Sequence, residues 1–398
     1  MKVLQINSVC GIRSTGRICT DLAQVLEQQG HECKIAYGRE TVPEQFQRFA
    51  VRIGNELGVR WDGVQTRLLD NAGFHSKNAT KRFLSWVKEY DPDVIHLHNL
   101  HGYYIHIGLL FEYLKESGKP VVWTLHDCWP FTGHCSHFDW IGCEKWKTQC
   151  DHCPQRDTYP TSLFIDRAKR NFEEKKMIFC GVPNLTLVSP SAWLKDLAEE
   201  SFLKEYPVRM IRNGIDLTHF SPTFGEFRRM YNITDKKLFL GVSSIWDHRK
   251  GFDAFLRGAS LLGKDEVFVL VGLSKKQNKQ LPTNIVGIER TNSVQQLAEI
   301  YSAADVFLNP TLEDNYPTVN LEAQACGTPV VTYRTGGSPE SVCNKNGKVV
   351  PKGDFPELLR AARNIVCDRE AVQSHAQQFN KQDKYLQYLR LYEECLCD

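Results

Sequence analysis

The segment 309–337 carries acids and backbone groups at a spacing that suits a nucleotide ligand. A strand ends at its first residue and a helix follows, with Asp314 ahead of the helix and Glu322 within it. The backbone N–H groups near Thr318 and Val319, at the start of that helix, can bind phosphate oxygens. The Glu322 carboxylate can accept two hydrogen bonds from the vicinal hydroxyls of a ribose. On its own, Glu322 could equally be a solvated helical glutamate.

A pair of cations precedes another predicted helix. Arg249 and Lys250 follow the predicted strand 237–242, and the helix begins near Gly251. Two adjacent cations at such a point suit a diphosphate and would stabilise the charge that develops on a leaving phosphate. Arg–Lys pairs are common on protein surfaces, so this pair gains its meaning from the acids described above.

Histidines gather after two strands in the first half of the chain. His126 and Asp127 stand directly at a strand end, where a histidine beside an acid can hold and polarise a polar ligand. His96, His98 and His101 follow another strand, and their alternation prevents all three from sharing one metal on a regular strand. We expect them to line a ligand-binding edge, with His98 among the more exposed.

The loop 8–16 contains Gly11 and Gly16, which permit tight turns and close backbone approach. It does not form a G-x-G-x-x-G pattern, and no acid ends the second strand to hold a ribose. A nicotinamide-dependent dehydrogenase is therefore disfavoured.

Short apolar runs alternate with amphipathic stretches along the whole chain, which predicts an α/β protein with parallel sheets covered on both faces. The predicted strands are 2–6, 32–36, 94–97, 121–125, 185–189, 208–211, 237–242, 267–271, 285–288, 306–309 and 330–332. The predicted helices include 15–29, 252–262, 294–302, 317–326, 355–366 and 381–397. Eleven strands favour two sheets over one, and the irregular segment 212–224 reads as the linker between two doubly wound units.

Composition narrows the function classes. The chain has 398 residues, 42% of them hydrophobic, with 49 Lys plus Arg against 47 Asp plus Glu. A net charge of +2 argues against a general nucleic-acid binder. No apolar run approaches the ~18 residues of a membrane span. The N-terminus predicts a strand and not a signal peptide, so we expect a cytoplasmic protein.

Five of the 14 cysteines fall within residues 128–153. Cys135, Cys143, Cys150 and Cys153 have spacings that could hold a structural zinc ion, with three nearby histidines as spare ligands. The alternatives are free thiols or thiols that pair reversibly. A closed four-ligand site would be structural, because catalytic zinc keeps an open position.

Taken together, these motifs resemble the retaining glycosyltransferases of family 4 (glycosyltransferase group 1), which have the GT-B fold. The resemblance spans essentially the whole chain. Within the family, the chain is similar to the polysaccharide-biosynthesis type. Its motifs are STG at 14–16, LHD at 125–127, NGID at 213–216, RKG at 249–251, residues 301–331, GGSPESV at 336–342 and NGKVV at 346–350.

The resemblance implies a role for each matching residue. The implied site residues are His126, Asp314 and Glu313 for catalysis, and Gly16, Ser244, Arg249, Lys250, Thr318, Val319 and Glu322 for donor binding. Two positions depart from the family pattern. Asp314 replaces the first glutamate of the paired-acid motif, with Glu313 beside it, and Ser244 stands where the family has an arginine.

The resemblance also implies two Rossmann-like domains that face a central cleft. We expect an acceptor domain at 1–212 with a Cys-rich insertion at 128–153, a donor domain at 213–380, and a terminal helix at 381–398 that packs back on the first domain.

The implied activity is retaining transfer of a hexosyl group from a UDP- or GDP-sugar to a hydroxyl of a glycan or a polyprenyl-diphosphate-linked acceptor, in cell-surface polysaccharide synthesis. No cofactor is required for it. The alternatives are another GT-B enzyme, such as a sugar-nucleotide epimerase or phosphorylase, or a non-catalytic nucleotide-sugar-binding protein.

A membrane is a further expected partner. The segment 75–88 contains four cations and no acid, interleaved with aromatic side chains. It could rest against anionic lipid headgroups at the inner face of the membrane. The simpler reading is a solvated helix face.

Overall fold

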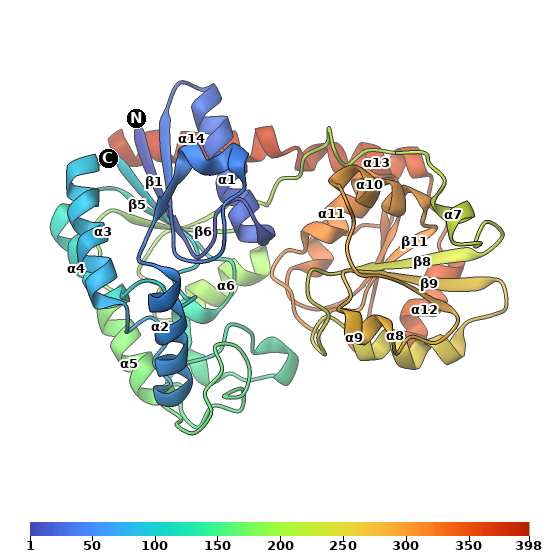
Figure 1. Ribbon diagram of the computed structural model, residues 1–398, viewed down its shortest axis with the longest axis horizontal. Coiled ribbons are helices and arrows are strands. Elements are labelled where there is room, and N and C mark those ends of the chain that lie inside the picture. The colour runs from blue at the N-terminus through green and yellow to red at the C-terminus, as the bar shows by residue number, and fades with distance from the viewer. Residues whose placement is uncertain (398) are drawn as a thin grey trace. The chain divides into compact units, whose positions relative to one another are not determined.

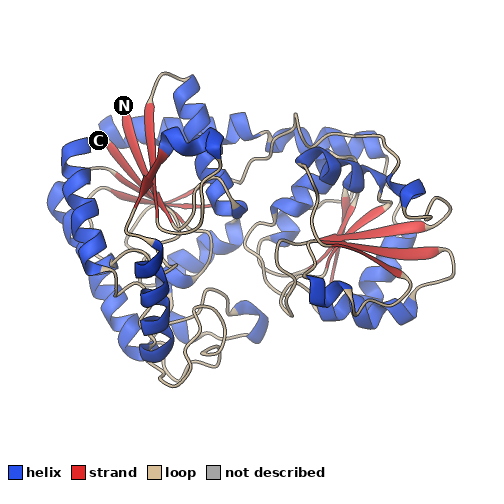
Figure 2. Cartoon of the chain, in the orientation of Figure 1, coloured by secondary structure: helices blue, strands red, loops and turns tan. Residues whose placement is uncertain are grey.

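The computed structural model describes residues 1–397, and the chain divides into two compact units (Figure 1). Among the described residues, unit 1 comprises 1–212 together with 384–397, and unit 2 comprises 213–383. One division falls after Arg212 and the other after Asp383. In each unit a parallel sheet lies between helices on both of its faces (Figure 2).

Unit 1 contains a seven-stranded parallel sheet in the order β3-β2-β1-β4-β5-β6-β7. Its strands are β1 (Lys2–Asn7), β2 (Glu32–Tyr37), β3 (Ala50–Arg52), β4 (Val94–Leu97), β5 (Val121–Thr124), β6 (Leu185–Ser189) and β7 (Val208–Met210). Its helices are α1 (Arg13–Gln28), α2 (Glu56–Leu69), α3 (Lys77–Tyr90), α4 (Ile107–Ser117), α5 (Ala168–Phe179) and α6 (Ala192–Glu200). The central strands are buried along their whole length because helices cover both faces.

Unit 2 contains a six-stranded parallel sheet in the order β10-β9-β8-β11-β12-β13. Its strands are β8 (Lys237–Val242), β9 (Glu266–Val271), β10 (Ile285–Ile288), β11 (Val306–Asn309), β12 (Val330–Tyr333) and β13 (Gly347–Val350). Its helices are α7 (Phe227–Met230), α8 (Phe252–Gly258), α9 (Lys275–Asn278), α10 (Val294–Ala303), α11 (Thr318–Ala325), α12 (Phe355–Asn364) and α13 (Arg369–Ala376).

Strand order reverses once in each sheet, between β1 and β4 in unit 1 and between β8 and β11 in unit 2. Ligands of open parallel sheets bind beyond the carboxyl ends of the strands at such a switch point. The loops that leave β4 and β11 carry His98 and Asp314, so the topology brings the predicted site residues to the switch points.

The last helix, α14 (Lys381–Cys397), packs against unit 1. Tyr385, Tyr388 and Tyr392 are buried in the same apolar cluster as the residues of α1. The Tyr392 hydroxyl lies 2.6 Å from His96 Nδ1, and the Tyr388 hydroxyl lies 3.1 Å from Thr124 Oγ1. The terminal helix therefore belongs to the core of unit 1.

The structure adds two strands to the eleven expected and shortens several helices. The three residues of β3 are too few to show a strand pattern, and β13 begins at Gly347 after an Asn–Gly turn. The segment 212–224 is more than a linker, because Ile215 and Phe220 are buried in the unit 2 core. Within residues 1–397, no helix has the length and apolar character needed to cross a membrane.

Candidate active site

A buried polar network fixes the loop between β11 and α11 in unit 2. Asn309, the last residue of β11, donates from Nδ2 to Asn320 Oδ1 at 2.8 Å. Asn320 donates in turn to the hydroxyls of Ser338 and Ser341 at 3.2 and 3.1 Å. Because Asn320 is fully buried, these bonds hold the first turn of α11 rigidly at the strand end.

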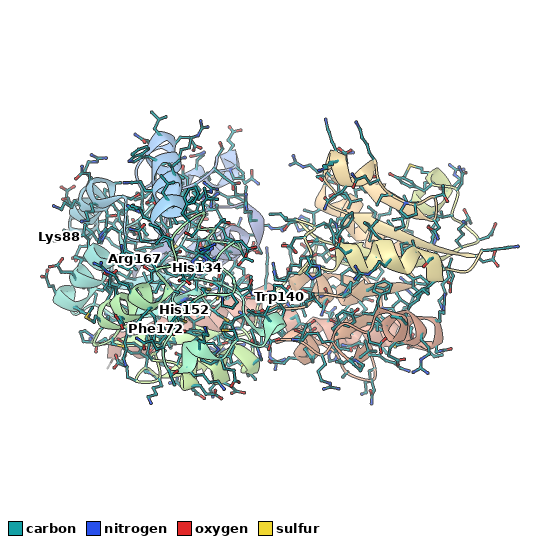
Figure 3. The ribbon with its side chains drawn as sticks, turned by 90° about the horizontal axis from the view of Figure 1, so that it is seen from below. Lys88, His134, Trp140, His152, Arg167 and Phe172 are labelled. Atoms are coloured by element: carbon teal, nitrogen blue, oxygen red, sulfur yellow. The ribbon has the colours of Figure 1, made fainter. Side chains whose placement is uncertain are left out.

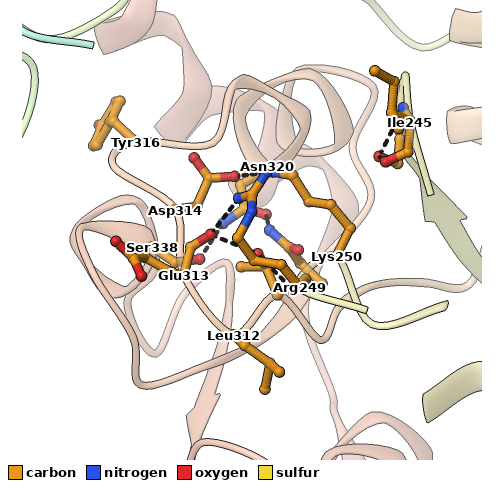
Figure 4. A network of polar contacts seen from close by, with 12 residues as sticks. Ile245, Arg249, Lys250, Leu312, Glu313, Asp314, Tyr316, Asn320 and Ser338 are labelled. Atoms are coloured by element: carbon orange, nitrogen blue, oxygen red, sulfur yellow. Dashed lines mark hydrogen bonds and ion pairs between the residues drawn. The ribbon is translucent and has the colours of Figure 1, made fainter. Parts of the chain in front are cut away.

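Arg249 and Lys250 reach this loop from the opposite side (Figure 4). The Arg249 guanidinium donates to the carbonyl of Glu313 at 2.8 Å, and the Arg249 carbonyl accepts from Leu312 N at 2.7 Å. The Lys250 ammonium forms an ion pair with the Asp314 carboxylate. Arg249 therefore fixes the loop between β11 and α11, whereas the Lys250 ammonium pairs with the carboxylate of Asp314, the predicted catalytic acid.

The two adjacent acids differ in exposure. The Glu313 side chain is fully buried, whereas the Asp314 side chain is 19% exposed. Gly336, at φ +52°, packs against the Asp314 backbone, and a Cβ there would lie 2.0 Å from the Asp314 carbonyl oxygen. Gly337 N donates to that same oxygen at 3.1 Å. Of the two acids, Asp314 is therefore the one whose carboxylate is accessible to solvent.

The start of α11 differs slightly from the sequence prediction. Pro317 is the N-cap with an extended backbone, and the helix begins at Thr318. No side chain caps this end of the helix, and Thr318 and Val319 are partly exposed. Glu322 lies one turn further on and is 8% exposed, with its Oε2 accepting from the Tyr301 hydroxyl at 2.9 Å. The tyrosine thus sets the direction of the Glu322 carboxylate.

Ser244 lies in the exposed loop after β8. The preceding residue packs so closely on Gly272 that a Cβ at Gly272 would lie 1.7 Å from the Ser243 carbonyl. The Ser243 hydroxyl donates to Ile245 O at 2.7 Å and closes the turn. The structure thus places Ser244 at the end of β8, with a side chain too short to substitute for an arginine.

In unit 1, His126 follows β5 and is hydrogen-bonded to a second histidine. His98 Nδ1 lies 3.0 Å from His126 Nε2, and His98 Nε2 lies 3.0 Å from Gln5 Oε1. The Gln5 amide nitrogen donates to the Cys19 carbonyl at 2.9 Å, which leaves Oε1 to accept from His98. The sequence prediction that His98 is exposed is wrong, because this side chain is buried at 2% exposure.

This relay fixes the tautomer of His126. Burial lowers the pKa of His98 well below its ordinary value and lowers the pKa of His126 to about 4, so both rings are neutral near pH 7. Neutral His98 donates from Nε2 to Gln5 and therefore accepts at Nδ1 from His126 Nε2–H. His126 Nδ1 then carries the lone pair and can accept a hydrogen bond from a ligand hydroxyl.

Asp127 is hydrogen-bonded to His101 and not to His126. Its Oδ2 lies 2.8 Å from His101 Nε2, and its Oδ1 accepts from Trp129 N at 3.0 Å. Burial raises the pKa of Asp127, but the His101 charge and these hydrogen bonds outweigh it and lower that pKa to about 2. An ionised Asp127 beside His101 anchors the loop that follows His126.

Gly16 lies within the first turn of α1, where its carbonyl accepts from Gly11 N at 3.0 Å. A Cβ at Gly16 would meet a Val9 methyl at 3.1 Å and Gly11 N at 3.2 Å. The glycine therefore allows the loop after β1 to close tightly onto the helix start. That packing accounts for the glycine without a ligand.

The four predicted zinc ligands line one small cavity of about 20 Å³. The Cys135 thiol and Cys153 share a hydrogen bond, which lowers the pKa of Cys153 to about 7. Across residues 1–397, no three His, Cys, Asp or Glu side chains stand together as a metal site. The zinc ion stays a prediction from the cysteine spacing.

Of the three nearby histidines, His134 lines this cavity and is labelled in Figure 3. Its Nδ1 bonds Asp70 Oδ1 at 2.5 Å, while its buried Nε2 has no hydrogen-bond partner. The His152 side chain is 92% exposed, so it is not held in place as a ligand would be.

Sequence reasoning missed the residues that support the site: Gln5, Tyr301, Asn320, Ser338 and Gly336. All but Gln5 lie within the motifs quoted above, but each acts through a contact with a distant segment, so its role could not be read from the motif. Gln5 gave one usable signal, because a lone polar residue within an apolar central strand needs a buried partner.

Two family models match the chain. Residues 15–219 match the model described as Glycosyltransferase Family 4, and residues 236–368 match that described as Glycosyl transferases group 1. Together they cover both units.

The chain is 26% identical over 376 residues to WcaC of Escherichia coli (strain K12), a protein assigned to colanic acid biosynthesis as a glycosyl transferase. This match covers 91% of the chain and 90% of WcaC. A D-inositol 3-phosphate glycosyltransferase of Corynebacterium jeikeium (strain K411) is 29% identical over 240 residues, which is 53% of the chain and 57% of that relative.

Solved structures share the fold. Sucrose-phosphate synthase from Thermosynechococcus elongatus superposes with a TM-score of 0.72 at 17% identity, over 100% of this chain and 99% of its own. Anabaena HepE in complex with UDP-glucose superposes with a TM-score of 0.68 at 14% identity, over 99% of this chain and 100% of its own. With two Rossmann-like units and family matches across both, the chain has the GT-B fold and belongs to glycosyltransferase family 4.

Proposed function

We propose that this glycosyltransferase moves a hexosyl group, with retention of anomeric configuration, from a UDP- or GDP-sugar to a hydroxyl of a glycan or polyprenyl-diphosphate-linked acceptor. The observation that carries the proposal is the Lys250–Asp314 pair beside the uncapped start of α11. The Lys250 ammonium and the helix N–H groups that no side chain caps, both beside the loop after β11, suit a diphosphate.

Some of these residues bind the nucleoside diphosphate that leaves, and another contacts the sugar that is transferred. Lys250 and the amides of Thr318 and Val319 stabilise the diphosphate as the bond from the anomeric carbon to phosphate breaks. Glu322, directed by Tyr301, holds the ribose hydroxyls. Asp314 faces the sugar. Arg249 positions the loop that carries Asp314 and contributes its positive charge to the diphosphate site.

Unit 1 provides the acceptor side of the reaction. His126, with its lone pair at Nδ1, accepts a hydrogen bond from a sugar hydroxyl and does not act as a cation. The acceptor oxygen forms the new bond on the face that the diphosphate leaves, and its proton passes to a departing phosphate oxygen. This route needs no covalent nucleophile and no cofactor.

The relatives suggest the biological setting. WcaC is assigned to colanic acid biosynthesis, and its match spans nine-tenths of both chains. We therefore place this enzyme in cell-surface polysaccharide synthesis, working from the cytoplasmic side, where nucleotide sugars are made.

A donor screen followed by a transfer assay tests the proposal. UDP- and GDP-sugars are screened by thermal shift, and the best donor is incubated with lipid-linked acceptors, with the product anomer read by NMR. Conversion of the donor without acceptor would instead assign an epimerase. Binding of a donor with neither hydrolysis nor transfer to any acceptor would assign a sensor.

A further inference from the structure

We infer that unit 1 binds an acidic sugar, meaning a pyranose that carries a carboxylate, in a groove beside α2. The groove has a volume of about 380 Å³ and lies between α2 and the loops that follow β2 and β4. Arg39, Arg67 and Tyr103 are among its lining residues, and the site is here named the arginine groove. The inference deepens the proposed function and rests on it, because it assigns the acidic sugar to the glycan acceptor.

Two arginines of the groove lie over one aromatic ring. The guanidinium carbons of Arg39 and Arg67 are 5.6 and 6.0 Å from the centroid of the Tyr103 ring. In the part of the chain that the structure describes, neither guanidinium forms an ion pair with an acid. Because arginine stays protonated at every physiological pH, these two positive charges line the groove without a counter-charge.

The groove also has two acids, and each of them is paired with other arginines. The Glu40 carboxylate lies 2.5 Å from the Arg13 guanidinium. The Glu56 carboxylate lies 3.3 Å from the guanidinium of Arg52 and 3.5 Å from that of Arg60. These pairs neutralise the acids, so an anion that enters the groove is attracted by the two arginines over the tyrosine ring.

The backbone around the groove is held in an unusual conformation. Three residues that are not glycine have a left-handed φ there: Arg13 at +56°, Glu40 at +65° and Tyr103 at +70°. Such conformations cost free energy and persist only where the surrounding structure enforces them, and they gather at ligand-binding sites. Their gathering here indicates that the fold shapes this groove to present the arginines to a ligand.

The chemistry of the lining selects an acidic sugar. A guanidinium donates two parallel hydrogen bonds to a carboxylate, so paired arginines fix both the position and the orientation of that group. Apolar surface lies beside them: Val64 is 43% exposed, and the Tyr159 ring, 6.1 Å from that of Tyr103, is 41% exposed. The C–H face of a pyranose packs against such surfaces. A small inorganic anion would use the arginines alone.

A chain of contacts joins the arginine groove to His126. Asp127, the next residue along the chain, accepts from His101 Nε2 at 2.8 Å, and His101 Nδ1 lies 3.1 Å from the Tyr159 hydroxyl. The Tyr159 ring then packs edge-on against Tyr103. The groove therefore lies on the same sheet edge as the histidine that we assign to the acceptor. Because the proposed donor residues belong to unit 2, the acidic sugar is part of the acceptor.

Saturation-transfer NMR of the full-length protein tests this inference without a transfer reaction. The probes are D-glucuronate and D-galacturonate, with D-glucose and D-galactose as their neutral counterparts. We expect at least one uronate to bind about tenfold or more tightly than its neutral counterpart, because only the uronate pairs with the guanidinium groups. Its binding should weaken at about 0.5 M salt. Inorganic phosphate should displace it poorly, because phosphate has no sugar ring to pack on the apolar surface.

Single substitutions locate the site. Arg39→Gln and Arg67→Gln should each lower uronate affinity by about tenfold. Arg82→Gln is the matched control, since it removes the same charge from an exposed position of α3 and should bind like wild type. Tyr103→Leu removes the ring under the arginines and should also weaken binding, whereas Tyr103→Phe keeps the ring and should retain it. Far-ultraviolet circular dichroism checks that each variant is folded.

Donor binding by the same variants separates this inference from the proposed function. Arg39→Gln and Arg67→Gln should bind UDP- or GDP-sugars like wild type in thermal shift. Wild-type protein that binds a uronate through Arg39 but binds no nucleotide sugar would contradict the proposed function and leave the site standing.

Three results would overturn the inference itself. One is wild-type protein that binds neither uronate, or binds both no better than the neutral sugars. Another is uronate affinity that is unchanged in both the Arg39→Gln and the Arg67→Gln variant. The third is inorganic phosphate that displaces the uronate at equal concentration, which would reduce the arginine groove to a simple anion site.

Discussion

The relay from Gln5 through His98 to His126 makes a prediction about a single proton. Replacing Gln5 by Met removes the acceptor for His98 Nε2–H while keeping the shape of the side chain. His98 is 2% exposed, so water cannot replace the lost partner. An unpaired buried donor costs about 1–3 kcal/mol, which is the amount by which Gln5 favours the observed tautomer.

Converted to a ratio, 1–3 kcal/mol corresponds to a preference of roughly 5- to 150-fold. In wild type we therefore expect His126 to be protonated at Nε2 in at least about four-fifths of molecules. In Gln5→Met the preference disappears, and close to half of the molecules should carry the proton at Nδ1. Turnover should fall by up to about twofold, since the tautomer with the proton at Nδ1 cannot accept from a ligand hydroxyl.

The assay is nitrogen-15 NMR of the histidine rings, which distinguishes a protonated from an unprotonated ring nitrogen. Gln5→Glu is the matched control, because it also loses the amide donor but keeps an acceptor for His98. The tautomer should persist in Gln5→Glu and shift in Gln5→Met. Protonation of His126 at Nδ1 in wild type, or an unchanged tautomer in Gln5→Met, would refute the relay.

The relay also predicts a pH dependence. Since the folded His126 pKa is about 4 and an unfolded histidine titrates near 6.5, the unfolded state binds more protons between these values. The stability that the neutral ring contributes is present above pH 6.5 and is lost as the pH falls towards 4. Chemical denaturation at pH 7 and pH 5 should show lower stability at pH 5, and His126→Phe should reduce that difference.

Three further predictions concern unit 2 and the cysteines. Lys250→Ala should lower turnover on the order of a hundredfold. Because the two side chains contact each other, the double variant with Asp314→Asn should lose less transition-state stabilisation than the two single variants lose together. Additive losses in kinetics would contradict the pairing. Glu322→Gln should weaken binding of the free nucleoside diphosphate by about 1.5–3 kcal/mol in calorimetry, and wild-type affinity would exclude the ribose assignment. Purified protein should contain about one zinc per chain, and removal of the zinc should lower the melting temperature. The zinc site would be ruled out if elemental analysis found no zinc and if alkylation of the native protein modified Cys135, Cys143, Cys150 and Cys153.

The sequence by itself determined the α/β class and most of the strands, because apolar periodicity and turn residues are local signals. It also indicated Asp314, Glu322, Arg249 and Lys250, since acids and cations next to strand ends stand out in an apolar pattern. Their roles remain predictions from the family resemblance. The three-residue β3 left too short a pattern to recognise.

Only the tertiary structure decided which of these groups face one another. The ion pair of Lys250 with Asp314 joins residues 64 positions apart, and the bond from His98 to Gln5 spans 93. Burial separated Glu313 from Asp314 although the two are neighbours in sequence, because adjacent residues of a loop can point to opposite sides. Likewise, Phe83 of α3 is buried and stacks on Trp86, whereas Trp61 of α2 is 64% exposed. A pattern of residue types records what a segment could bury, and packing against distant segments decides what it does bury.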